Sequence, residues 1–134
     1  MTVRSSTRRR AFDLALFLDP EIDRRPIQLT LSHLRSMCLT ARGVGWRNAL
    51  PRLGLRTIIG RLRAMRLDAL TVEDVAEGLL PMLDTPDMPQ RLRDTIVDVA
   101  MRSRVVPNDD LLQSPHAEVR MAALLASAAE RDTA

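Results

Sequence analysis

The sequence predicts an all-α protein, and three features carry that prediction. The apolar content is dominated by Leu, Ala, Val, Ile and Met, of which Leu, Ala and Met favour helices. Aromatic residues, which strands favour, make up only 2% of the chain, and Tyr is absent. Pro and Gly divide the chain into about seven segments with helical spacing of apolar residues. At 134 residues the chain has the length of one domain, so we expect a single helical unit over residues 1–134.

Proline and glycine bound the first helices that we expect. Residues 7–18 are apolar on most sides and end before Asp19-Pro20. Pro26 suits the first turn of a second helix, where its missing N–H costs no helical hydrogen bond, and Gly43 is suited to ending that helix. A Gly-Val-Gly-Trp turn leads to a third helix over residues 51–66. One face of the second helix carries Ile27, Leu31, Leu34 and Cys38.

The fourth helix has a clear start signal. Thr71 is a good N-cap, and Asp74 stands three residues later, where a capping box places an acidic residue. Pro81 lies inside the apolar pattern and should kink the helix or end it early. The apolar residues at helical spacing are Val72, Val75, Ala76, Leu79 and Leu83.

Three further helices complete the prediction. Asp87 is the expected N-cap of the fifth helix, and Pro107-Asn108 opens a short turn of helix. Ser114 and Pro115 start the last helix, which should run to about Glu130. One side of the fifth helix is lined by Leu92, Ile96, Val99 and Ala100.

The last two long helices follow similar stretches of sequence. LDTPDMPQRLRDTIVDVAMRS and LQSPHAEVRMAALLASAAE both run from Leu through Thr-Pro or Ser-Pro to an apolar residue followed by Arg. Leu92-Arg93 in the first copy corresponds to Val119-Arg120 in the second. The run SPHAEVRMAALLA resembles the second-helix signature of HEAT and related α-helical repeats. That resemblance implies stacked helical pairs that approach each other through Ala122, Ala123 and Ala126.

Two architectures therefore stay open for the all-α fold. One is a small helical bundle, and the other is a short HEAT-like α-solenoid of about seven helical segments. In the second case the repeat-like part is residues 68–134, while residues 1–67 form a basic half of different character.

The two halves of the chain carry opposite charge. Residues 1–66 hold 14 Arg and 4 acidic residues, whereas residues 67–134 hold 6 Arg and 13 acidic residues. There is no Lys, and the ten Arg from Arg24 to Leu67 are not interrupted by any acid. Such asymmetry is typical of chains that bind nucleic acid or an acidic partner.

The arginines of residues 51–66 are ordered on the predicted helix. At 100° per residue, four of them lie within about 80° of one another, and Arg61 lies on the far side. The neighbouring face is apolar and carries Leu55, Ile58, Leu62 and Met65. The residues that we expect to bind a partner are Arg52, Arg56, Arg63 and Arg66.

Three targets compete for this stripe of arginines. The chain's own acids, such as Glu73, Asp74 and Glu77, would partly neutralise a solvated face. A partner protein with an acidic surface is the target that we expect, and DNA or RNA is the alternative. Pro51 and Gly60 fall where a helix-turn-helix motif needs a continuous first helix and an aliphatic core residue. A homo-oligomer also stays open.

Catalytic and metal-binding chemistry is sparse. His33 and His116, the two histidines, stand in no nucleophile motif, and Asp109-Asp110 has no further ligands nearby in sequence. Cys38 is the only cysteine, so no intrachain disulfide can form, and we expect it to be a small buried apolar residue. The sequence thus predicts a non-enzymatic adaptor or regulatory module with no catalytic residue, metal or cofactor.

The location that we expect is cytoplasmic, in a protein of bacterial style. Arg9 to Phe12 resembles the core of a twin-arginine export signal, but Asp13 and Asp19 interrupt the apolar stretch that follows. No window approaches the roughly 18 apolar residues that a membrane span needs, so we expect no membrane partner.

Overall fold

The computed structural model describes residues 23–133 and, within them, the side chains of all but residues 51–53 and 132–133. The described residues are helical throughout their regular structure and contain no strand, as the composition predicts. The predicted helix over residues 7–18 lies outside the described residues. The α-helices are α1 (Arg25–Val44), α2 (Trp46–Leu53), α3 (Leu55–Arg63), α4 (Gln90–Ser103), α5 (Asn108–Leu111) and α6 (Ala117–Thr133). Three further segments are η1 (Leu67–Ala69), η2 (Asp74–Leu79) and η3 (Leu80–Asp84).

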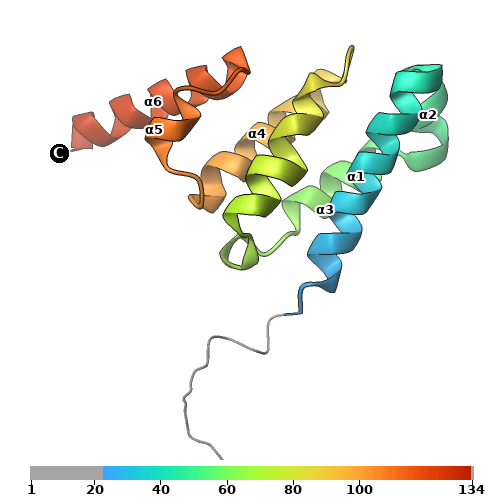
Figure 1. Cartoon of the computed structure of the whole chain (residues 1–134), viewed down its shortest axis with the longest axis horizontal. Coiled ribbons are helices and arrows are strands. Elements are labelled where there is room, and N and C mark those ends of the chain that lie inside the picture. Colours follow the sequence, from blue (N-terminus) through green and yellow to red (C-terminus); the bar gives the residue numbers. More distant parts are fainter. Residues whose placement is uncertain (1–22, 134) are drawn as a thin grey trace, which may run out of the picture.

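The helices form a row of three antiparallel units, which we call the first, second and third hairpins. In the first hairpin α1 packs against α2 and α3, which together form its second arm. In the second the continuous stretch η2–η3 packs against α4, and in the third α5 packs against α6. Neighbouring hairpins meet through α3 and α4, through α4 and α6, and through α1 and η2–η3. The row runs from α1 and α2 at one end of Figure 1 to α6 at the other end.

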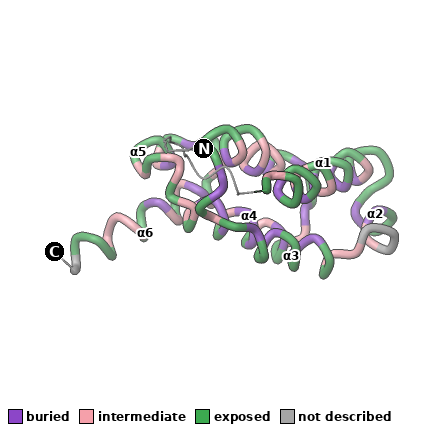
Figure 2. The backbone as a smooth tube through the Cα atoms, turned by 90° about the horizontal axis from the view of Figure 1, so that it is seen from below, coloured by how far each residue is buried: buried purple, intermediate pink, exposed green. Residues whose placement is uncertain are grey.

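The core follows this row, because each hairpin buries its apolar side chains against the next. Leu34, Ile58, Val75, Leu92 and Val119 are fully buried and come from all three hairpins. In Figure 2 the buried stretches lie where helices face one another, and exposed residues are more frequent toward the C-terminal end of α6. The outer face of α6 exposes Met121, Leu124 and Leu125.

The bounds of α1 agree with the prediction. The helix begins at Arg25 with Pro26 in its first turn and ends at Val44, one residue after the expected stop. Gly45 ends it with a positive φ of 85°, which glycine adopts without strain. Of the predicted apolar face, Ile27, Leu34 and Cys38 are buried and Leu31 is half-buried.

The predicted single helix over residues 51–66 is wrong, because the chain breaks at Gly54. Gly54 has φ 75° and separates α2 from α3, and its N–H donates to the carbonyl of Leu50. α3 then ends at Arg63, and Arg66 is in an extended conformation with φ −72° and ψ 108°. Residues on the two sides of Gly54 therefore do not share one helical surface.

The capping box at Thr71 is confirmed. The Thr71 N–H donates to Asp74 Oδ2 at 2.9 Å, and the Asp74 N–H donates to Thr71 Oγ1 at 3.1 Å. The capping role predicted for Asp87 is wrong, because α4 begins at Gln90 directly after Pro89. Asp87 instead lies in the preceding turn with a left-handed φ of 59°.

Pro81 changes the hydrogen-bond pattern of its helix without ending it. The stretch is a wide π-helical turn over η2 and then a tight 3-10 turn over η3, into which Pro81 falls. A proline has no N–H to donate, so the regular ladder cannot pass through it. Val75 and Leu79 are buried as predicted, but Val72 is 51% exposed, because the wide turn shifts the inner face away from it.

Candidate partner-binding surface

The four arginines of the predicted stripe do not lie on one helix. Arg56 and Arg63 belong to α3, and both are exposed. Arg66 follows the end of α3, and Arg52 belongs to α2, where its side chain is outside the described part. The structure thus brings together two of the four predicted residues on one helical face.

α3 separates its arginines from its apolar side chains. Ile58, Ile59 and Leu62 are buried on its inner side. Arg56 and Arg63 are seven residues apart, which places them on the same side of the helix about 10 Å apart along its axis. Gly60 lies between them, and no atom stands within 4 Å of the position that its Cβ would take. The outer face of α3 is therefore open between its two arginines.

Neither of these two arginines is neutralised within the described structure. The guanidinium groups of Arg56 and Arg63 form no ion pair and no hydrogen bond to residues 23–133. Both groups are exposed to solvent and available to a carboxylate or a phosphate. We call Arg56 and Arg63 the α3 arginine pair.

Arg66 has a partner of its own. Its guanidinium donates to Asp68 Oδ2 at 2.8 Å, and the two side chains are 60% and 65% exposed. Hydrogen bonding from Arg66 lowers the pKa of Asp68. An exposed pair of this kind contributes little to stability, but it removes Arg66 from the set of uncompensated charges.

One acid of the acidic half pairs with Arg24, an arginine outside the predicted stripe. Arg24 pairs with Asp74 at 2.9 Å and also donates to the carbonyl of Ala69. Burial acts to raise the pKa of Asp74, but hydrogen bonds from Arg24 and Thr71 outweigh it and hold that pKa below its usual range. Glu73 and Glu77, the other candidate internal partners, form no ion pair with any described residue. Among these arginines, the described acids neutralise Arg24 and Arg66 and leave the α3 arginine pair without an ion pair.

Arg61 faces α1, on the opposite side of α3 from the pair. Its Nη1 lies 3.4 Å from His33 Nδ1. Burial and then the nearby positive charge of Arg61 lower the pKa of His33, which favours its neutral imidazole. His33 accordingly acts as a polar contact between α1 and α3.

The prediction left out three further exposed arginines of the first hairpin. Arg35 and Arg42 belong to α1 and Arg47 belongs to α2, and none forms an ion pair among the described side chains. The sequence feature that could have identified them is the run without acids from Arg24 to Leu67, which extends well beyond residues 51–66. The uncompensated positive charge is therefore spread over the whole first hairpin.

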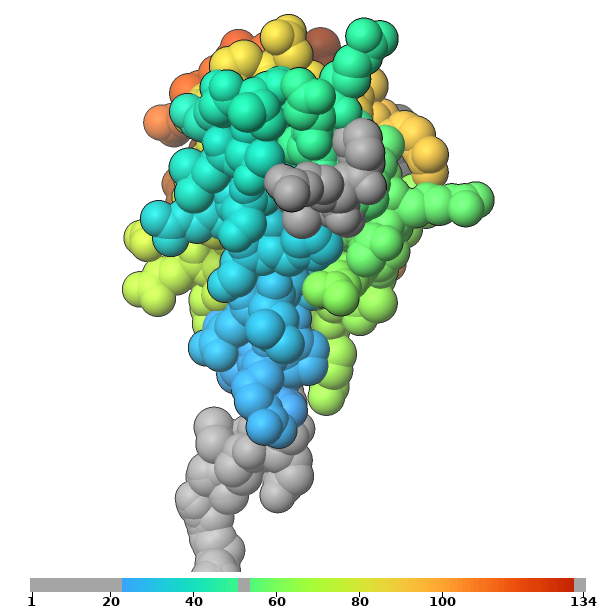
Figure 3. Space-filling model, turned by 90° about the vertical axis from the view of Figure 1, so that its right-hand side faces the viewer, coloured from blue at the N-terminus to red at the C-terminus, as the bar shows by residue number. Residues whose placement is uncertain are grey.

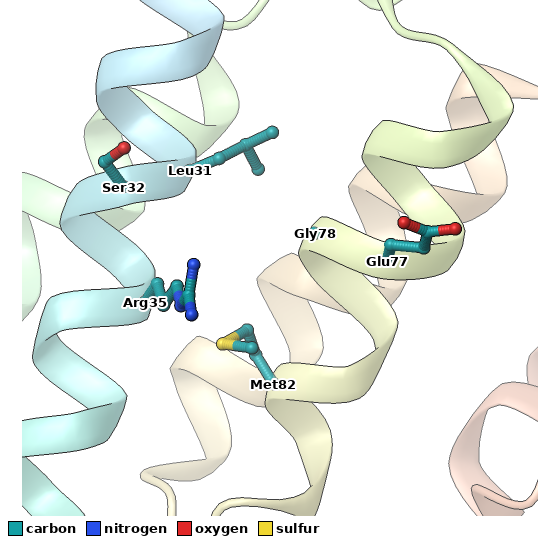
Figure 4. A pocket seen from close by; sticks show the side chains of 6 residues that line it. All are labelled: Leu31, Ser32, Arg35, Glu77, Gly78 and Met82. Carbon is teal, nitrogen blue, oxygen red and sulfur yellow. The ribbon is translucent and has the colours of Figure 1, made fainter.

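Arg35 also stands at a groove between the first and second hairpins. The groove has a volume of about 470 Å³, and Figure 4 shows Arg35 on the α1 wall and Glu77 on the η2 wall. The two helices come close here, because a Cβ on Gly78 would lie 3.2 Å from Leu31 Cδ1. Leu31 and Met82 supply apolar surface between the charged walls.

The repeat-like positions in the second and third hairpins are structurally equivalent in burial. Leu92 and Val119 are both fully buried. Arg93 forms a two-bond ion pair with Glu118, with Nε 2.8 Å from Oε1 and Nη2 2.7 Å from Oε2, which joins α4 to α6. Arg120 instead donates to the carbonyl of Ser114 at 2.6 Å.

Other chemical groups are scattered. His116 Nδ1 lies 3.6 Å from Asp84 Oδ1, and Cys38 is buried, which raises the pKa of its thiol. Within residues 23–133, no three His, Cys, Asp or Glu side chains gather closely enough to hold a metal ion. No described helix combines the length and the apolar character that crossing a bilayer requires.

Comparison with known proteins assigns no family. No family model matches the chain, and no curated protein and no solved structure matches it either.

Proposed function

We propose that this protein is a non-enzymatic adaptor or regulatory module that binds the acidic surface of a partner protein. The observation that supports this proposal is the α3 arginine pair, Arg56 and Arg63, exposed on one face and uncompensated by any described carboxylate. Arg52, in α2 just before Gly54, and Arg66, which follows α3 and would exchange its exposed contact with Asp68, are proposed to extend the same contact.

The chemistry of the pair suits carboxylates on another protein. A guanidinium binds a carboxylate through two parallel hydrogen bonds. The open surface at Gly60 allows a partner to approach the helix backbone between the two arginines. Electrostatic complementarity of this kind speeds encounter and selects the partner.

Binding to DNA or RNA is the second candidate. The further exposed arginines of the first hairpin, Arg35, Arg42 and Arg47, support it, since contacts to phosphates carry most of the affinity for nucleic acid. Such binding would not use a helix-turn-helix motif. Gly54 alone joins α2 to α3, whereas that motif has a turn of about three or four residues.

The row of hairpins also supports a HEAT-like reading of residues 68–134. The Arg93–Glu118 pair and the equivalent burial of Leu92 and Val119 fit a repeated unit, although α5 has only four residues. With no disulfide possible for a single cysteine, we further propose a cytoplasmic location in a bacterial cell. Self-association stays a prediction.

The test is a double charge reversal with a matched control. R56E/R63E should lose its partner protein, or weaken the affinity about tenfold or more, because each change turns attraction into repulsion. R91E/R131E reverses two exposed arginines, one on α4 and one on α6, that form no ion pair among the described side chains, and it should bind normally. Partners captured from a bacterial lysate are identified by mass spectrometry, and the affinity for each is then measured with purified proteins.

Two outcomes would contradict the proposal. R56E/R63E could retain the same partner with unchanged affinity, which would make the pair a solvated face. Alternatively, the wild type could bind a short labelled DNA duplex in fluorescence anisotropy with a steep salt dependence that R56E/R63E loses, which would favour nucleic acid. Circular dichroism should show equal helix content in all variants.

A further inference from the structure

A groove lies between the beginning of α1 and the end of α3. It has a volume of about 470 Å³, and neither member of the α3 arginine pair lines it. Figure 3 shows this end of the molecule, with the N-terminal part of α1 in blue beside the green end of α3. The lining residues that matter here are Pro26, Ile27, Leu29, Arg61, Ala64 and Met65.

The inner part of the groove is apolar. Ile27 and Met65 line it and are buried, whereas Leu29 lines it with 66% of its surface exposed. Thr30 is also a lining residue, and its hydroxyl donates to the carbonyl of Pro26 at 2.9 Å. An apolar side chain of a partner can therefore bury surface here without leaving that hydroxyl unpaired.

The charged side chains of the groove leave one guanidinium without a carboxylate. Asp23 and Arg66 line the groove, and each is in an ion pair with a residue two positions away in the sequence. Arg61 is exposed, its Nη1 lies 3.4 Å from His33 Nδ1, and no carboxylate of the described side chains pairs with it. Arg61 is therefore available to a carboxylate of a partner.

The surroundings of the groove carry the same sign of charge. Residues 23–66 hold ten Arg and one acid, Asp23. A field of this sign attracts acidic ligands and repels basic ones. Apolar surface beside uncompensated positive charge selects a segment that is both apolar and acidic.

We propose that this groove binds an acidic helical segment of the partner protein, which inserts two apolar side chains between Leu29 and Met65 and pairs a carboxylate with Arg61. This proposal rests on the proposed function, because it gives the same acidic partner a second contact. The lining residues on α1 run from Pro26 to Thr30, about 6 Å along the helix, which equals the spacing of side chains four residues apart on a partner helix. Grooves between helices bind amphipathic helices through apolar residues at this spacing.

Fluorescence anisotropy with the full-length protein and defined peptides tests the proposal. The probe is a labelled helical peptide of about 15 residues, built from Glu and Ala with two Leu four positions apart. One control peptide has both Leu replaced by Ser, and the other has every Glu replaced by Gln. The Glu–Leu peptide should bind about tenfold or more tightly than either control, because each control lacks one of the two features that the groove recognises.

A charge placed in the groove should remove this binding. Leu29→Asp should weaken the Glu–Leu peptide about tenfold or more, because the new carboxylate repels the acidic ligand and interrupts the apolar surface. Leu39→Asp is the matched control, because Leu39 is on the same helix, is 58% exposed and does not line the groove. It should bind normally, and circular dichroism should show equal helix content in both variants.

Arg61→Gln tests the charge contact. It should weaken the Glu–Leu peptide about threefold or more and leave the affinity for the Gln–Leu peptide unchanged, so that the loss depends on the carboxylates of the ligand. Equal losses for the two peptides would show that Arg61 pairs with no carboxylate, which would overturn the assignment to an acidic segment.

R56E/R63E separates this proposal from the proposed function. The double reversal leaves the groove intact, so it should weaken peptide binding less than L29D does. Loss of the intact partner by R56E/R63E, together with equal peptide binding by L29D and the wild type, would overturn the groove proposal and leave the proposed function standing. A partner retained by R56E/R63E, together with peptide binding lost by L29D, would have the opposite meaning.

Three other results would overturn the groove proposal. One is a wild type that binds all three peptides equally or binds none. Another is a wild-type dimer in sedimentation velocity that L29D dissociates, which would assign the groove to a second copy. The third is hydrogen-exchange protection of residues 1–22 that L29D removes, which would assign the groove to the chain's own N-terminal segment.

Discussion

At the scale of single residues, Asp74 connects more of the fold than any other acid described above. Its carboxylate accepts the N–H of Thr71 in the capping box and also pairs with Arg24 on α1, so one side chain both starts a helix and joins two hairpins. Only 13% of the Asp74 side chain is exposed. A charge-assisted hydrogen bond in such a position is stronger than one at the surface.

The pH dependence of stability should report this residue. The pKa of Asp74 lies below its unfolded value of 3.8, so its stabilisation is complete above pH 3.8 and is lost as the pH falls through the lower, folded pKa. Asp74→Asn keeps the shape but removes the charge, and it should cost about 1 to 2 kcal/mol at neutral pH. In denaturant titrations, the gap between wild type and D74N should shrink below pH 3.8. A gap that does not change with pH would mean that the charge contributes nothing.

At the scale of elements, the break between α2 and α3 depends on one glycine. Gly54 has a positive φ, and a Cβ there would lie 3.2 Å from Thr57 Oγ1, whereas Gly60 is helical and open. Gly54 is therefore needed for its backbone conformation, whereas Gly60 occupies an ordinary helical position that alanine could fill.

Alanine at these two positions should have opposite effects. Gly54→Ala should destabilise the protein by about 1 kcal/mol or more, because alanine is strained at positive φ. Gly60→Ala should stabilise it by about 0.5 to 1 kcal/mol, because alanine is the better helix former at an exposed helical site. Thermal unfolding of both variants measures the difference. A stabilising G54A would show that α2 and α3 can join into one helix.

The elements also show which features the sequence was able to predict. The capping box at Thr71 and the ends of α1 were correct, because each depends on residues only a few positions apart. The exposure of Val72 could not be read from a regular helical wheel, because a π turn follows it.

The candidate site was predicted in part, for similar reasons. Arg56 and Arg63 share a face because both lie on α3, which is unbroken between them. Arg52 is separated from both by the break at Gly54. The ion pair of Arg66 could have been foreseen from the sequence, since Asp68 is only two residues away. The pairing of Arg24 with Asp74 joins residues 50 positions apart and depends on tertiary packing.

At the scale of the whole molecule, the row of hairpins limits how far a local change travels. α6 contacts α4 and α5 but not the first hairpin. In rows of helical units, stability depends on each unit and on its contacts with neighbours. We therefore expect the third hairpin to be able to unfold while the first two stay folded.

Ala123→Arg should distinguish unfolding of the third hairpin alone from unfolding of the whole protein. Ala123 is fully buried, and an arginine there forces an unpaired charge into the contact of α6 with its neighbours, at a cost of about 3 kcal/mol or more. We expect circular dichroism to lose helix content while the fluorescence of Trp46, which lies in the first hairpin, stays native. Leu124→Arg, at a position 53% exposed, should change neither signal. If both signals of A123R were lost together, the three hairpins would fold as one cooperative unit.

The burial of Cys38 has a practical consequence for spectroscopy. It is the only thiol in the chain, it is 2% exposed, and burial raises its pKa, so little of the reactive thiolate reaches solvent. A cysteine introduced on the outer face of α3 would therefore be alkylated far faster than Cys38. A fluorophore or spin probe could thus be attached at one chosen position without first replacing the native residue.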